Sequence, residues 1–217
     1  LIFCALFAAS GFEAVFAIVL LMSFFLSAAL PLLETTTLAH IGAHHGRYGR
    51  LRIWGSLGFI AAVTLIGYAL DAFAVAVLLW IMLAVLIAAS VMLIAVPEAP
   101  HAEHDETSAP IMQILRQPPV VALFIACALM AVAHGPYYTF YSIFLVDHGY
   151  SKSAVGWLWT LGVVCEIAIF YWLAHLLRAF SLRAVLIASF VLATIRFLVI
   201  GWCADSLIML LLAQTLH

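Results

Sequence analysis

Six apolar runs, each long enough to cross a lipid bilayer, recur along this chain and constrain its fold more than any other feature. Crossing about 30 Å of hydrocarbon takes roughly 17–25 helical residues. Hydrophobic residues make up 68% of the chain and charged residues 8%, and the mean hydropathy is +1.24, a balance unlike that of soluble domains. We therefore predict an all-α, polytopic transmembrane helix bundle. The predicted spans are 12–33, 53–71, 73–96, 119–146, 154–176 and 183–203.

Both ends of the sequence carry further apolar residues, at 1–9 and 206–217, which look like spans that have been cut short. Leu1 is not a start methionine, and His217 lies inside an apolar segment. We therefore expect a fragment that is truncated at both ends, so that any function belongs to a longer parent protein.

One long polar insertion, at 97–118, divides the chain into two membrane blocks, 1–96 and 119–217. Proline and acidic residues dominate its first part, PEAPHAEHDETSAP, which cannot bury enough apolar surface to fold and is predicted to be a flexible linker. The following IMQILRQPP predicts a short interfacial helix. Two bundles joined by one long cytoplasmic loop is an arrangement that many transporters share.

Arginine residues fall on one side of the predicted membrane. The breaks at 34–52, 97–118 and 177–182 carry arginines. In the breaks between them, Lys152 is the only lysine or arginine. The positive-inside rule places the arginine-bearing breaks in the cytoplasm. We expect a multi-pass protein of the plasma (inner) membrane, with the lipid bilayer as its first partner.

The 34–52 break combines one acidic residue with several basic ones: Glu34, Arg47, Arg50 and Arg52. We expect a structural cytoplasmic loop here. Its arginines are close enough to cap the preceding helix end, to pair with Glu34, or to contact anionic lipid headgroups.

Two opposite charges lie near the middle of neighbouring spans, Glu166 in one and Arg196 in the next. Charges at membrane depth are costly and mark solute or proton pathways. A guanidinium near a buried carboxylate favours its ionised form, so a pair that separates as the protein changes shape is a proton switch. We predict proton coupling by this pair. A static buried ion pair that fixes helix packing and direct solute binding by Arg196 stay open as alternatives.

A row of polar aromatic residues shares one face of the span 119–146, at spacings of three and four: His134, Tyr137, Tyr138 and Tyr141. Gly135 and Pro136 are predicted to interrupt this helix and free backbone carbonyls. Stacking area and hydrogen bonds suit an aromatic or sugar-like solute. The alternatives are interfacial tyrosines and a neutral, packed His134.

Histidines also cluster on the predicted cytoplasmic side, as HxxxHH (His40, His44, His45) and HxxH (His101, His104). Imidazole clusters suit iron and zinc, and histidine-box desaturases and hydroxylases use boxes of this shape. The further HxxHH box of those enzymes is absent from the sequence. We keep a membrane metalloenzyme as an alternative but expect no metal site.

The segments YGRLRIWGSLGFI (48–60) and HGPYYTFYSIFLVDHGYSKSAVGWLWTLGVVCEI (134–167), with PLLETTTLAH and LLAQTLH, resemble the major facilitator superfamily. The similar branch is the phenylpropionate-permease-like, nucleoside/proton-symporter-related group. The resemblance implies a twelve-helix fold, of which this chain holds the end of helix three to the start of helix ten.

The resemblance also implies site roles. Helices seven and ten line the central cavity in this fold, which favours solute contacts for Tyr137, Tyr138 and Tyr141, and adds His217. In lactose-permease-like symporters, coupling uses a helix-eight carboxylate, a helix-nine arginine and polar residues of helix ten. Glu166, Arg196 and His217 occupy comparable places.

Together these observations predict a secondary active transporter that takes up a small organic solute, such as an aromatic carboxylate, together with protons. A major facilitator exporter is the alternative. We expect no enzymatic activity, catalytic residue or cofactor, no nucleic-acid partner and no requirement for an oligomer.

Overall fold

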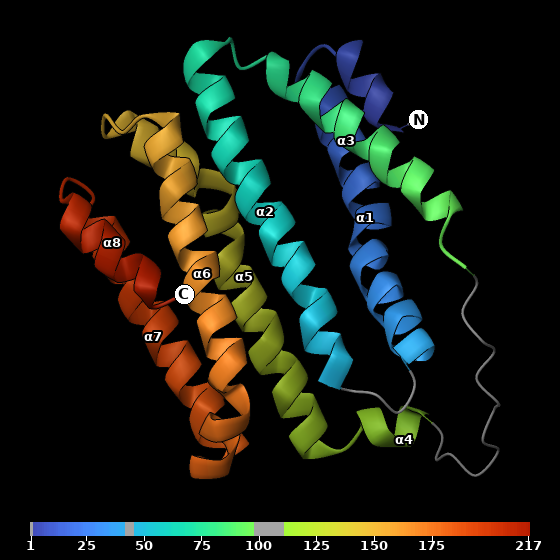
Figure 1. The fold of residues 1–217 in the computed structure, drawn as a ribbon, viewed down its shortest axis with the longest axis vertical. Helices are drawn as coiled ribbons and strands as arrows, with labels where there is room; N and C mark the ends of the chain where they lie inside the picture. Colours follow the sequence, from blue (N-terminus) through green and yellow to red (C-terminus); the bar gives the residue numbers. More distant parts are fainter. Residues whose placement is uncertain (1, 42–45, 98–110) are drawn as a thin grey trace. The chain divides into compact units, whose positions relative to one another are not determined.

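The structure, a computed structural model, describes residues 2–41, 46–97 and 111–217, without the side chains at 41, 46–50, 52, 173 and 174 (Figure 1). Every regular element within these ranges is helical, which confirms the predicted all-α fold class. The elements are η1 (Ile2–Phe7), α1 (Phe12–Ile41), α2 (Gly46–Ala72), α3 (Val77–Ile94), α4 (Ile111–Leu115), α5 (Pro118–Asp147), α6 (Lys152–Ala179), α7 (Leu182–Trp202) and α8 (Leu207–Thr215).

Six of the described helices are long and apolar enough to span a membrane, and each coincides with a predicted span. Most of their large apolar side chains are exposed in the isolated chain. Helix α3 is apolar on every side and buries none of its residues, as expected of a helix that lipid solvates. The short helix α4 forms within the segment IMQILRQPP, where a short helix was predicted; its place at the membrane interface stays a prediction.

The first span is longer than predicted, and much of the predicted 34–52 loop is helical. Helix α1 continues to Ile41, so Glu34 lies in a helix rather than in a loop. Local bonds support the added turns: the hydroxyls of Thr35 and Thr37 donate to the carbonyls of Leu32 and Leu33 at 2.9 and 2.7 Å. Threonine bonds of this kind satisfy helix carbonyls from the side chain.

The predicted break at Gly135 and Pro136 is wrong, because α5 runs without interruption from Pro118 to Asp147. Proline removes one hydrogen bond from a helix interior, and the turns on either side here keep theirs. The Thr139 hydroxyl donates a hydrogen bond to the carbonyl of Gly135, next to the proline, at 2.9 Å. The tyrosines of this span are therefore presented by one continuous helix.

The predicted loop at 177–182 is also shorter in the structure. Helix α6 ends at Ala179 and α7 begins at Leu182, with the Ser181 hydroxyl accepting the backbone N–H of Ala184 at 3.2 Å. Ser151 and Ser206 cap α6 and α8 in the same way. A serine at this position satisfies one of the free N–H groups that begin a helix.

The chain divides into two compact units, which are described separately. The first comprises Leu1–Arg52 and Phe73–Glu103. Within it η1 packs against α1 and α3, and the ring centroids of Phe7 and Trp80 lie 4.6 Å apart. The second comprises Ile53–Ala72 and His104–His217, so α2 from Ile53 onward associates with the helices that follow the linker. The division of the whole protein into blocks 1–96 and 119–217 stays a prediction.

Helices α5, α6, α7 and α8 of the second unit share one buried core. Helix α8 packs against α6 and α7, and α5 packs against α6. The core residues come from all four helices: Tyr137, Tyr141, Leu145, Val155, Leu158, Ile200, Leu210 and Ala213. Two of the eight are tyrosines, whose hydroxyls need partners once they are buried.

Candidate functional site

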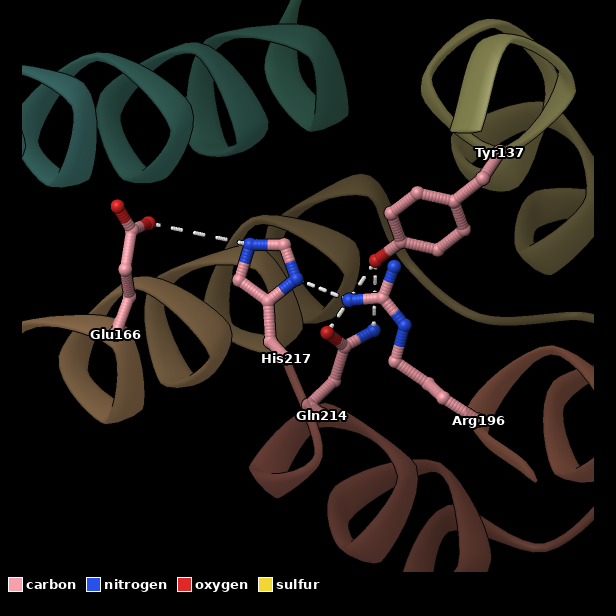
Figure 2. Close-up of polar contacts among 5 residues, drawn as sticks. All are labelled: Tyr137, Glu166, Arg196, Gln214 and His217. Carbon is pink, nitrogen blue, oxygen red and sulfur yellow. Dashed lines mark hydrogen bonds and ion pairs between the residues drawn. The ribbon is translucent and has the colours of Figure 1, made fainter. Parts of the chain in front are cut away.

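A polar cluster lies inside this core, formed by α5, α6, α7 and the end of α8 (Figure 2). Arg196 of α7 and Gln214 of α8 are each only 1% exposed, although both are polar. A buried polar side chain is costly unless it finds partners. The partners of these two residues therefore define the site.

Gln214 joins the two buried tyrosines. Its Nε2 donates to the hydroxyl oxygens of Tyr137, at 3.1 Å, and of Tyr141. The Tyr137 hydroxyl donates in return to Gln214 Oε1 at 3.3 Å. This amide consequently fixes the positions of two rings on the face that the sequence analysis singled out.

Arg196 lies against aromatic rings. Its guanidinium carbon is 4.4 Å from the centroid of Tyr137 and 4.9 Å from that of Phe197, distances at which a cation is attracted to a ring face. Nη1 contacts His217 Nδ1. Among the described residues, Arg196 Nε and Nη2 are buried without a hydrogen-bond partner. The cluster thus holds a buried cation with donors to spare.

His217 bridges the two predicted coupling residues. A guanidinium can only donate, so His217 Nδ1 accepts from Arg196 and the ring hydrogen of a neutral imidazole is on Nε2. That Nε2 lies 4.0 Å from Glu166 Oε2. Glu166 and Arg196 are therefore brought together through His217, whereas the sequence analysis considered direct pairing. Figure 2 shows the three side chains in this order.

Tyr138 and His134 lie beside the cluster rather than inside it. Tyr138 is 58% exposed and stacks on Trp159 of α6, with ring planes 15° apart and centroids 5.8 Å apart. His134 Nδ1 donates to the Met130 carbonyl at 2.9 Å, and its ring meets Phe197 edge-on at 5.1 Å. Both residues extend the aromatic surface next to Arg196.

Two residues of the site, Gln214 and Trp159, were not predicted from the sequence. Gln214 is a polar residue in an apolar run, three positions before His217, so helical periodicity places it on the same face. Trp159 contacts Tyr137, Tyr138 and Tyr141 with centroids 5.0, 5.8 and 5.3 Å away. Nothing in the local sequence separates it from the other tryptophans of the chain.

Only part of the predicted 34–52 loop and of the histidine clusters lies within the described residues. Glu34 is half-buried in α1 of the first unit, while the side chains of Arg47, Arg50 and Arg52 lie outside the described residues. His44, His45, His101 and His104 lie outside them too. Within the part of the chain that the structure describes, no three His, Cys, Asp or Glu side chains gather as metal ligands would.

Comparison with known proteins relates the whole chain to one family. The model of the MFS_1 like family matches residues 1–217. The chain is 32% identical over 180 residues to a "Probable 3-phenylpropionic acid transporter" of Escherichia coli (strain K12), covering 78% of this chain and 45% of that protein. It is 33% identical over 100 residues to a "Maltose permease" of Geobacillus stearothermophilus, covering 46% of this chain and 25% of that protein. These matches span less than half of either relative, and no solved structure matches the chain.

Proposed function

The chain belongs to the MFS_1 like family, and from this premise we propose that it serves a proton-coupled transporter that takes up a small aromatic carboxylate across the plasma membrane. Membership places it among multi-pass membrane transport proteins rather than enzymes. We propose the identity of the solute, the coupling to protons, the inward direction of transport and the plasma membrane. The polar cluster supports the first two.

The observation that carries the proposal is the buried Arg196 with unpaired Nε and Nη2 groups among the described residues. A guanidinium presents its donors in a planar fork that matches a carboxylate. Because a buried charge without partners is strongly unfavourable, an anionic solute is the ligand that this position suits best.

Aromatic rings around Arg196 favour an aromatic body for that solute. Tyr137 and Phe197 flank the guanidinium, and Tyr138 and Trp159 continue the surface. Offset and edge-on ring contacts are each worth about 0.5–1.5 kcal/mol beyond burial. The name of the Escherichia coli relative, which specifies 3-phenylpropionic acid, agrees with a solute that carries a carboxylate on an aromatic body.

The position of His217 supports the proposed proton coupling. In the described geometry Nδ1 accepts from Arg196, while Nε2 is directed toward Glu166. A proton added at Nδ1 replaces this acceptor by a donor, which cannot face the guanidinium. The imidazolium then pairs with the Glu166 carboxylate, and Arg196 becomes free for the carboxylate of the solute. Solute and proton binding thereby favour one another, as symport requires.

The experiment uses the full-length protein in proteoliposomes. An inward proton gradient is imposed, and internal pH is followed together with uptake of aromatic acids, nucleosides and sugars. We expect proton influx that depends on an aromatic acid. Uptake without proton movement would identify a facilitator, and expulsion of the solute an exporter; either result would return Glu166, His217 and Arg196 to a static packing role.

A further inference from the structure

A cavity lies between α2, α5 and α6 of the second unit, outside the polar cluster. Its volume is about 190 Å³. Aliphatic side chains form most of the wall, from Val63, Ile66 and Leu70 of α2 and Val146 of α5. Ser142 of α5 and Trp159 of α6 are among its other lining residues.

The walls of this cavity are held by direct contacts between α2 and α6. The Asp71 carboxylate accepts the backbone N–H groups of Lys152 and Ser153 at 2.8 and 2.9 Å. About two helical turns away in the same interface, the hydroxyl oxygens of Thr64 of α2 and Thr160 of α6 lie 3.0 Å apart. The cavity is therefore preformed, as small-molecule sites usually are.

The size and lining select an aromatic ring. An apolar cavity of about 150 Å³ is sufficient to bind benzene, so 190 Å³ accepts one ring with a short side chain. The indole of Trp159 offers a stacking surface, while its Nε1 donates to Ser142 Oγ at 3.2 Å.

The charge at one end selects an anion. Lys152 lines the cavity, and its Nζ donates one hydrogen to the Leu70 carbonyl at 2.7 Å, which leaves two ammonium hydrogens. The Asp71 carboxylate, which accepts the backbone N–H groups of Lys152 and Ser153, keeps its negative charge beside Lys152. The cavity therefore offers an anion the two remaining ammonium hydrogens rather than a net positive charge, and an apolar body with these donors at one end fits a monocyclic aromatic carboxylate.

Trp159 connects this cavity to the polar cluster, because its indole lines the first and contacts Tyr137 and Tyr141 of the second. We infer that the α2–α5–α6 cavity is a second binding site for a monocyclic aromatic carboxylate, separated by the Trp159 side chain from the site at Arg196. The inference rests on the proposed function for its ligand class. With the orientation predicted from the arginines, Lys152 faces outward, so a solute entering the cell meets this site first.

The number of bound ligands tests the inference. Radiolabelled 3-phenylpropionate is equilibrated with the purified full-length protein in nanodiscs, and we expect two molecules per protein. Val63→Phe fills the cavity and should leave one. The matched control is Leu65→Phe on the same helix, whose side chain is 67% exposed and outside the cavity lining, and which should keep two.

A second variant separates loss of the site from loss of folding. Arg196→Met should remove the polar-cluster site and leave one ligand, which the added Val63→Phe change should abolish. One bound molecule in the unmodified protein, no binding at all, or two molecules in Val63→Phe would each overturn the inference. Two-site binding without proton-coupled uptake would instead reject the proposed function and leave the cavity site standing.

Discussion

Gly156 of α6 packs so closely against Val63 of α2 that a β-carbon at Gly156 would lie 2.6 Å from the Val63 carbonyl oxygen. The same holds in the other direction, where a β-carbon at Gly67 of α2 would lie 2.8 Å from the Lys152 carbonyl oxygen. Real β-carbons do not approach backbone atoms this closely. The two helices therefore meet through their backbones, and the interface depends on the absence of side chains at both glycines.

Gly156→Ala should destabilise the protein, because the methyl group meets backbone rather than a flexible side chain. Overpacking of a tight interface typically costs about 1–3 kcal/mol. Thermal unfolding of the purified protein in detergent measures the effect. Gly201→Ala is the matched control, since no atom lies within 4 Å of its added carbon, and it should leave Tm unchanged or slightly higher. Equal Tm values for both variants would show that the α2–α6 contact is loose.

Asp71→Asn should weaken the junction between α2 and α6. The charged carboxylate accepts two backbone N–H groups at the start of α6, where the helix dipole favours a negative charge. The amide keeps one acceptor oxygen and loses the charge. Thermal unfolding should show a lower Tm than for Asp147→Asn, a change at the exposed C-terminal end of α5. Indistinguishable Tm values would mean that the Asp71 contacts are not maintained in the membrane.

Glu166→Gln should abolish proton-driven accumulation of solute while sparing exchange of solute across the membrane. The amide neither takes up a proton nor forms an ion pair with a protonated His217, whereas Arg196 keeps its donors for the solute. Accumulation and counterflow in proteoliposomes measure the two activities separately. Glu13→Gln at the exposed start of α1 is the control. Accumulation that matches the unmodified protein would rule out a coupling role for Glu166.

Tyr138→Ala should raise the apparent KM for an aromatic solute several-fold, because the ring stacks on Trp159 beside the polar cluster. Initial uptake rates over a range of solute concentrations give KM and maximal rate separately. Tyr171→Ala removes another exposed tyrosine, 80% exposed on α6, and should leave KM unchanged. A constant KM with lower expression of Tyr138→Ala would instead indicate a packing role.

The helices could be predicted because each span is a local pattern. Apolar runs of bilayer length predicted the six candidate spans found among the described residues. The errors arose where local composition was ambiguous. The first span was predicted to end at residue 33, before Glu34, but α1 continues to Ile41 and the hydroxyls of Thr35 and Thr37 bond within the helix. Pro136 suggested a break, but one proline removes one hydrogen bond from a helix of thirty residues.

The candidate site could be predicted only where a residue is chemically out of place. Glu166 and Arg196 are charges in apolar spans, so depth alone identified them. That His217 lies between them depends on how α8 packs against α6 and α7, which no local pattern specifies. Trp159 was missed for the same reason, because tryptophan is unremarkable in a membrane span until its neighbours are known.

The contact between Asp71 and the start of α6 also has a consequence for the order of events during synthesis. The two bonds join residues 81 and 82 positions apart in sequence, and the linker and α5 are made in between. When α2 leaves the ribosome, the carboxylate therefore has to remain hydrated until α6 follows. The start of α6 then binds Asp71 of the already inserted α2. In Asp71 variants this contact is lost, so we expect newly made chains to be cut more often by protease near Lys152.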